Sequence, residues 1–259
     1  MKRTLLESLL IGHPSFHRKY HDLTHTKTEF VWNATSEWAM DMLIHIPNSS
    51  LAIYLSHALP MFYKNNKYHG LYHAVCVANR AQGIVMQALG KMTEEERRME
   101  SYTAWIAGLF HDAGYSLTEP DSTNVAVSAE IFTDILSREN PLQKFMDEHG
   151  ITSESVIEAI LCTQFDKHLV AFPVEPKSLA AKALRDADLS GHMESGWPAM
   201  LAGLAIEMDM NPDSWSDIKK FLTRQYDFIS KQKMYIDIGM TYEAKRNYLT
   251  GLYKVIKEM

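Results

Sequence analysis

The sequence predicts an all-α protein built as a helical bundle. Apolar residues recur at spacings of three and four along almost the whole chain, the pattern of helices with one buried face. No alternating polar and apolar segment is longer than a few residues, so β-strands are not expected. With 259 residues and 46% hydrophobic content, the chain is long enough to bury a large core.

The predicted helices are separated by proline, glycine or asparagine. They run over residues 36–46, 50–65, 73–90, 94–114, 125–138, 152–164, 177–189, 197–208, 213–231 and 241–258. The helix at 73–90 is expected to end on Gly90, and the next one to start behind Thr93, a good N-cap followed by an acidic turn. The polar segment 116–124 is predicted to be the loop that follows it.

Residues 50–259 are expected to form one domain, because no linker within them is long or flexible enough to separate two. Residues 1–49 are predicted to be an N-terminal helical extension packed on that domain. The first fourteen residues are too polar for a secretory leader, and no segment approaches the roughly 18 apolar residues that cross a bilayer. We therefore expect a cytoplasmic protein that does not enter a membrane.

The charge pattern limits the classes of partner. The formal net charge is −6, and acidic and basic residues are interspersed, which argues against an extended nucleic-acid surface. Cys76 and Cys162 both lie in apolar, helix-like segments, where a thiol is usually a small buried hydrophobic group. We expect no disulfide. The composition leaves open whether the chain forms a homo-oligomer.

Two similar heptads stand out, KYHDLTH at residues 19–25 and KYHGLYH at residues 67–73. The second is followed by AVCVANRAQ, an apolar-spaced helix, whereas the first is followed by the polar TKTEF. Chemistry is therefore assigned to the second heptad, and the role of His21 and His25 stays open.

Three motifs share the residue types of a metal centre. His73 opens a predicted helix, His111 and Asp112 close another in LFHDAGY, and an acidic pair in RDADLSG, Asp186 and Asp188, ends a third. Imidazole nitrogens together with carboxylate oxygens suit Mn²⁺, Fe²⁺, Co²⁺ or Zn²⁺.

These motifs resemble the HD superfamily of metal-dependent phosphohydrolases, whose fingerprint is a histidine, a distant His-Asp pair and a later aspartate. The blocks YHGLYHAV, AGLFHDAGY, STNVAVSAEIF, ILCTQFDKH, RDADLSG and YEAKRNYLTGL follow the order of a bacterial branch of predicted HD phosphohydrolases, over roughly residues 55–259. The resemblance implies an HD-domain bundle with His73, His111, Asp112 and Asp188 as ligands. Asp186 would then lie behind the ligands or in solvent.

The YHxxxH spacing is also similar to the catalytic helix start of cyclic-nucleotide phosphodiesterases. That resemblance implies His69 as a general acid beside His73 as a ligand. The chain departs from the phosphodiesterase pattern at Gly70, where asparagine is usual, and at Tyr115, where a second-metal histidine is usual. The second departure favours a single divalent ion, which could be Mn, Fe, Co, Zn or Mg.

The resemblance implies hydrolysis of a phosphate ester of a small nucleotide substrate, as in a nucleotidase or nucleoside-triphosphate hydrolase. Asp112 would also orient the attacking water. Arg185, Lys182 and His168 lie near the motifs and are predicted to bind the substrate. Two alternatives are a cyclic mono- or dinucleotide phosphodiesterase and a non-catalytic nucleotide-binding module.

Overall fold

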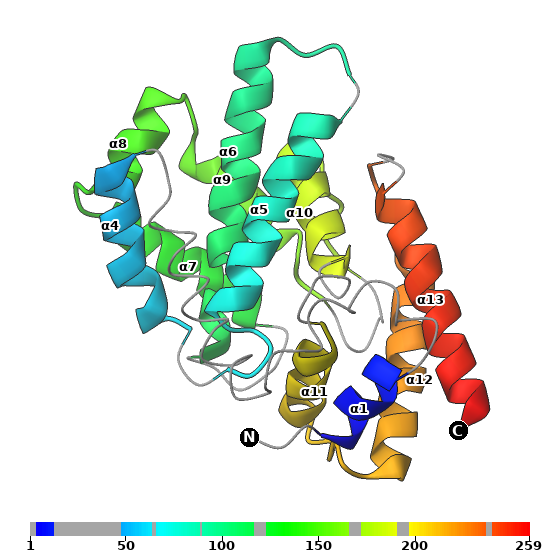
Figure 1. The fold of residues 1–259 in the computed structure, drawn as a ribbon. Helices are drawn as coiled ribbons and strands as arrows, with labels where there is room; N and C mark the ends of the chain where they lie inside the picture. The colour runs from blue at the N-terminus through cyan, green and yellow to red at the C-terminus, as the bar shows by residue number, and fades with distance from the viewer. Residues whose placement is uncertain are drawn as a thin grey trace.

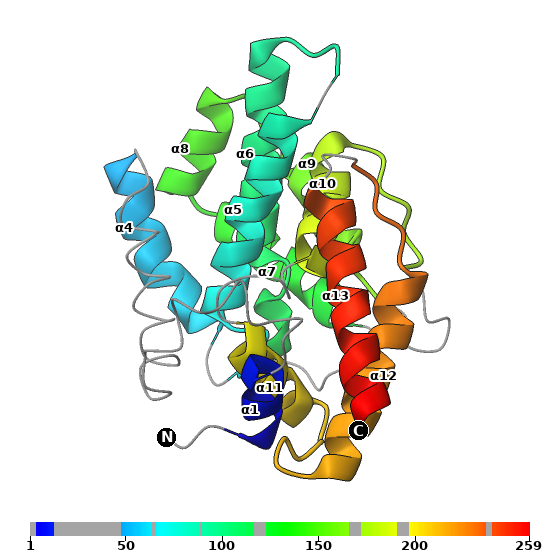
Figure 2. The ribbon, with the colours of Figure 1, turned by 45° about the vertical axis from the view of Figure 1, so that its right-hand side comes forward.

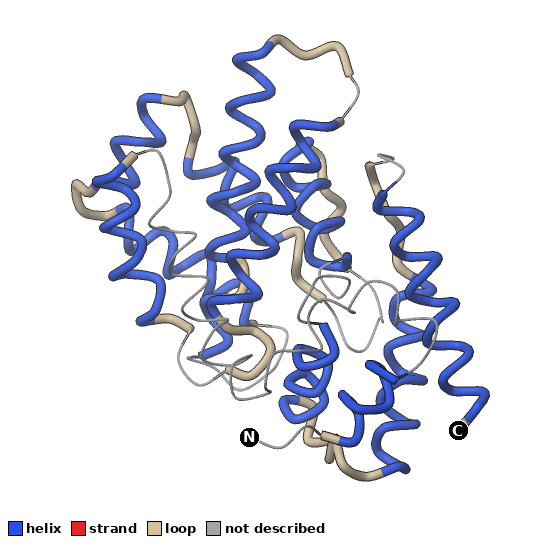
Figure 3. Tube along the Cα trace, viewed as in Figure 1, coloured by secondary structure: helices blue, strands red, loops and turns tan. Residues whose placement is uncertain are grey.

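The computed structural model describes residues 4–12, 48–63, 66–88, 90–116, 123–165, 172–190, 197–236 and 240–259. Helices joined by loops and turns make up these residues, and none of them forms a strand (Figure 3). The predicted all-α class is therefore confirmed. In the described part of the chain, no helix is both long enough and apolar enough to cross a membrane.

A hairpin of two long helices stands at the centre of the larger core (Figure 1). It consists of α5 (Leu71–Gln87) and α6 (Glu94–Phe110). Around it lie α4 (Ser49–Ala58) with the short η1 (Leu59–Met61), α7 (Asn124–Leu136), α8 (Pro141–Glu148), α9 (Ser153–Leu161) and α10 (Leu179–Ser190). The start of α5 and the end of α6 meet at the same end of the hairpin, which brings His73 close to His111.

A second, smaller core lies beside the first (Figures 1 and 2). It is formed by α1 (Leu5–Gly12), α11 (Trp197–Glu207), α12 (Trp215–Lys231) and α13 (Met240–Glu258). Leu6 and Leu10 of α1 are fully buried in it, together with Leu189 at the end of α10. The last turn of α10 therefore joins the two cores, with Asp188 at the junction.

The N-terminal helix is fixed to this second core. The backbone N–H of Leu6 donates to the Pro212 carbonyl over 2.9 Å, and the N–H of Leu5 donates to Oδ1 of Asp213 over 2.7 Å. Residues 13–47 lie outside the described part of the chain, and with them the predicted helix 36–46, His21 and His25. The boundary at residue 49 stays a prediction.

Several helix ends differ from the prediction for physical reasons. The α6 helix starts where expected, with a capping box between Thr93 and Glu96. It stops at Phe110 instead of 114, and η2 (Ala113–Ser116) follows. A Cβ on Gly114 would lie 2.1 Å from the Asn124 carbonyl oxygen, so the chain turns here to pack its backbone directly on α7. The Gly114 N–H donates to Oγ of Ser128 over 2.9 Å.

The sequence prediction missed α8, and it gave no bounds for α1, which lies in the predicted N-terminal helical extension. The signals for α8 are present: Asn140 caps it by accepting from the N–H groups of Leu142 and Gln143, and Pro141 occupies the first turn. Gly150, with φ of 66°, ends it. The predicted helix 50–65 is shorter than expected, because Pro60 enters a 3₁₀ turn after residue 58.

The two helices of the central hairpin approach very closely at one point. A Cβ on Gly108 of α6 would lie 2.5 Å from Cα of Ala78 and 2.8 Å from its backbone nitrogen on α5. The neighbouring atoms are backbone, which cannot move aside as the end of a flexible side chain can. Glycine at 108 and alanine at 78 therefore set the distance between α5 and α6.

Gly108→Ala is expected to lower the free energy of unfolding by about 1–3 kcal/mol, because the added methyl group overpacks the helix contact. Urea denaturation of the two proteins measures the difference. Gly83→Ala on α5 is the matched control: its Cβ would meet nothing nearer than Nε2 of Gln87 at 3.9 Å. That variant should gain about 0.5–1 kcal/mol, so equal losses in both variants would contradict the close approach.

Candidate metal centre

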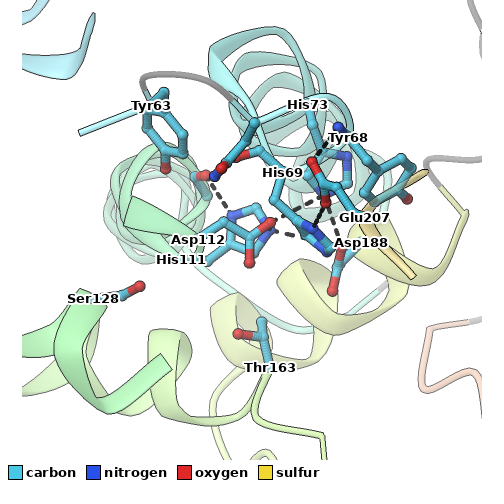
Figure 4. Close-up of polar contacts among 12 residues, drawn as sticks. Tyr63, Tyr68, His69, His73, His111, Asp112, Ser128, Thr163, Asp188 and Glu207 are labelled. Atoms are coloured by element: carbon cyan, nitrogen blue, oxygen red, sulfur yellow. Dashed lines mark hydrogen bonds and ion pairs between the residues drawn. The ribbon is translucent and has the colours of Figure 1, made fainter. Parts of the chain in front are cut away.

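Four of the predicted site residues lie together at the junction of the two cores (Figure 4). His73 belongs to the first turn of α5, His111 and Asp112 follow the last residue of α6, and Asp188 lies in the last turn of α10. The first three are almost completely buried, with exposed fractions of 4%, 0% and 5%. The side chain of Asp188 is 25% exposed and gives the cluster its contact with solvent.

The distances between these side chains suit a shared cation. Nε2 of His73 lies 3.3 Å from Oδ2 of Asp112 and 3.2 Å from Oδ1 of Asp188. Nε2 of His111 lies 3.0 Å and 3.7 Å from the same two oxygens. Ligand atoms about 2.0–2.2 Å from a metal are about 2.8–3.6 Å apart on neighbouring corners of an octahedron or a tetrahedron. Each histidine thus has an oxygen neighbour on either side at close to the spacing that a bound ion imposes.

Hydrogen bonding gives independent support for a cation here. Nδ1 of His111 lies 2.8 Å from the Gly108 carbonyl, which only accepts, so Nδ1 carries a proton. In the neutral ring Nε2 then presents a lone pair towards Oδ2 of Asp112. These two buried atoms lie 3.0 Å apart, yet neither has a well-aligned hydrogen-bond partner. A metal ion between them would satisfy both atoms, and the carbonyl bond orients the ring as outer partners of metal ligands do.

The electrostatics favour positive charge at this point. Burial lowers the pKa of His73 and of His111, but contacts with Asp112 and Asp188 outweigh burial and raise both pKa values above the ordinary one. Burial raises the pKa of each aspartate, and the histidines more than reverse that effect. Both carboxylates are therefore ionised, as metal ligands must be, and a bound cation would take the place of the protons that the raised pKa values put on the two imidazoles. Within the described residues, His73, His111 and Asp112 form a group that could hold a metal ion.

His69, the candidate general acid, lies at the edge of this cluster, with its ring centroid 6.0 Å from that of His73. Its Nδ1–H donates to Oε2 of Glu207 over 2.6 Å. The other carboxylate oxygen of Glu207 accepts from the backbone N–H groups of Lys67 and Tyr68 over 2.5 and 2.6 Å. The last residue of α11 therefore holds the loop that carries His69.

Sequence reasoning missed Glu207. It lies in AIEMD, which contains no recognisable motif, and its partners precede it by 138 to 140 residues. Burial raises the pKa of Glu207, but the hydrogen bond and charge of His69, with the two backbone N–H groups, lower it overall. Glu207 is thus an ionised acceptor with three donors.

Aromatic side chains form the walls of the site. Tyr115 stacks on His69 with ring centroids 3.9 Å apart and an angle of 13° between the planes. Tyr68 packs against His73 at 4.6 Å, and the Tyr63 hydroxyl donates to the Leu109 carbonyl over 2.7 Å. Burial, followed by the charges of Asp112 and Asp188, raises the pKa of Tyr115 far above its usual value, so its phenol is neutral.

Asp186 points away from the cluster. It is fully buried and accepts from the backbone N–H groups of Tyr235 and Ile236 over 2.9 and 2.7 Å. Burial raises its pKa to about 6, although these hydrogen bonds oppose the shift. Of the acidic pair, Asp188 therefore faces the histidines, and Asp186 joins α10 to the segment before α13.

Of the residues predicted to bind the substrate, Arg185 is enclosed within the fold. Arg185 is 2% exposed; its Nε donates to the Cys162 carbonyl over 2.8 Å, and its guanidinium lies 4.4 Å above the centre of the Phe172 ring. These contacts favour a structural role. Lys182 lies six residues before Asp188, about 9 Å along the axis of α10. His168 lies outside the described residues.

Comparison of the chain with protein-family models, with curated proteins and with solved structures finds no match. The resemblance to the HD superfamily therefore rests on the sequence motifs alone and stays a prediction.

Asp188→Asn is expected to weaken binding of Mn²⁺ or Zn²⁺ at least about tenfold, because it removes one of two anionic ligands. Isothermal titration of the purified protein measures the affinity and the number of ions bound. Asp186→Asn, two residues away, is the matched control and should bind as the wild type does. Equal affinity in all three proteins would contradict the assignment of Asp188.

Proposed function

We propose that this protein is a metal-dependent phosphohydrolase that cleaves a phosphate ester of a nucleotide. One observation carries the proposal: a cluster of two imidazoles and two carboxylates lies next to a histidine that a partly buried glutamate orients. Hydrolysis of a phosphate ester needs stabilisation of negative charge at phosphorus and a proton for the departing oxygen. The cluster and His69 supply these two requirements side by side.

We assign separate roles in catalysis to the residues of the cluster, to His69 and to Glu207. His73, His111, Asp112 and Asp188 would hold a divalent ion, which when bound supplies a Lewis acid and lowers the pKa of a bound water. Asp112, ionised and buried beside that position, would orient the attacking water. His69 would protonate the leaving oxygen through Nε2, since Nδ1 donates to Glu207. Glu207 accepts from Nδ1–H and so orients the imidazole, as the acidic partner of a catalytic histidine does.

A cyclic mono- or dinucleotide phosphodiesterase is the second candidate. The position of His69 beside the cluster favours it, because opening a cyclic phosphodiester also releases an alkoxide that must be protonated. A non-catalytic nucleotide-binding module is the third reading, and it would not require His69 to be oriented by Glu207. The nucleotidase and the cyclic-nucleotide phosphodiesterase would use the same site residues, so only the substrate that is cleaved distinguishes them.

A metal-supplemented substrate screen tests the proposal. Protein loaded with Mn²⁺, Co²⁺, Zn²⁺ or Mg²⁺ is given nucleoside mono- and triphosphates, cyclic mononucleotides and cyclic dinucleotides, and the products are separated by chromatography. Release of phosphate, pyrophosphate or triphosphate supports the first candidate, and a linear nucleotide supports the second. Binding of nucleotides without turnover under every metal would leave the non-catalytic module and reject both enzymes.

His69→Asn is expected to lower kcat about 10²–10⁴-fold while metal content stays unchanged, because the variant loses a proton donor and no metal ligand. Glu207→Gln should lower kcat less, since an amide oxygen can still accept from Nδ1–H. Steady-state kinetics with parallel metal analysis measure both effects. His57→Asn, at an exposed position in the last turn of α4, is the control. Unchanged turnover in His69→Asn would remove His69 from the mechanism.

A further inference from the structure

We infer that Tyr115 is a positioning residue for His69 and fixes the plane of its imidazole ring. The inference rests on the proposed function and goes further, because it assigns a role to a residue that is not a metal ligand in this chain. Tyr115 takes the position where the phosphodiesterase resemblance would place a second-metal histidine. A phenol there gives His69 an aromatic surface to lie on.

The ring contact is geometrically specific. The planes of Tyr115 and His69 are within 13° of parallel, and the centroids are 3.9 Å apart. Other ring pairs around the site are not arranged in this way: Tyr68 meets His69 edge-on at 79° and meets His73 at a tilt of 36°. A near-parallel contact at this distance covers one face of the imidazole and prevents the ring from turning out of its plane.

The stacking complements the hydrogen bond to Glu207. A single hydrogen bond through Nδ1 fixes one point of the imidazole but still permits rotation about the line between the two atoms. The stacked phenol removes that rotation. Together the two contacts define one ring orientation, and Nε2 has no hydrogen-bond partner among the described residues. Nε2 is the nitrogen from which His69 would donate a proton to the leaving oxygen.

The position of Tyr115 is tied to the metal ligands. Tyr115 lies in η2, three residues after Asp112, and its backbone N–H donates to the Asp112 carbonyl over 3.0 Å. The same turn is held against α7 by the Gly114 N–H, which donates to Oγ of Ser128. The same short segment therefore sets the place of a metal ligand and the plane of the proton donor.

The test compares substrates whose leaving groups differ in their need for a proton. Metal-loaded Tyr115→Leu, Tyr115→Phe and wild-type protein are assayed with benzyl phosphate, which releases an alkoxide, and with 4-nitrophenyl phosphate, whose phenolate leaves unprotonated. Tyr115→Leu is expected to lower kcat about 10–100-fold for benzyl phosphate and less than about threefold for 4-nitrophenyl phosphate. Tyr115→Phe keeps the ring and should retain both rates.

Tyr102→Leu is the matched control, because Tyr102 also packs on a histidine, His149, with centroids 4.7 Å apart. Its ratio of the two rates should equal that of the wild type, whatever its stability. Equal losses on both substrates in Tyr115→Leu, or no loss, would overturn the inference. So would a loss in Tyr115→Phe as large as that in Tyr115→Leu.

A second measurement separates this inference from the proposed function. Two-bond ¹H–¹⁵N correlation spectra report which nitrogen of His69 carries the proton, with the signal identified by its absence in His69→Asn. Wild type and Tyr115→Phe should show one set of signals with a protonated Nδ1, and Tyr115→Leu should show averaged tautomers. If wild type cleaves neither these esters nor any nucleotide of the substrate screen, the phosphohydrolase proposal fails, and unchanged His69 signals in Tyr115→Leu would overturn the positioning role independently.

Discussion

The close approach of α5 and α6 at Gly108 and Ala78 is the constraint on which the rest of the structure depends. A side chain at 108 would collide with the backbone of α5, so only glycine permits this helix spacing. The carbonyl of Gly108 also accepts from Nδ1 of His111. One residue thus sets the separation of the helices that carry His73 and His111 and orients one of the two rings. Because the backbones of the two helices are in direct contact, the position of one helix fixes the position of the other.

The cluster at the end of this hairpin is costly to the fold. Two imidazoles and two carboxylates, three of these groups almost fully buried, give up hydration that their mutual contacts only partly replace. Two buried atoms without well-aligned partners, Nε2 of His111 and Oδ2 of Asp112, lie where a cation would compensate both. Apolar residues of the same size would pack there at less cost. A buried cluster of charged groups lowers the free energy of unfolding, as binding sites commonly do.

The two cores meet at this cluster. Asp188 precedes Leu189, which packs in the second core, so this candidate ligand on α10 is held between the two cores. Glu207 reaches from α11 in the second core to the loop before α5. The smaller core therefore fixes the loop that carries His69. Helix α1 packs on α11 and supports the same arrangement from the N-terminal side.

The sequence by itself determined the all-α class, most of the helices and the residues of the candidate cluster. Those features are local: a spacing of three and four defines a helix face, and each candidate ligand lies beside a helix end that its own neighbours mark. The sequence could not find Glu207 or the stack of Tyr115 on His69, and it assigned Arg185 to the substrate although its guanidinium is bonded inside the fold. Each depends on a partner brought in by the packing of other helices, up to 140 residues away for Glu207. Only the tertiary structure decides such contacts, because no short-range pattern records which distant group a buried side chain will meet.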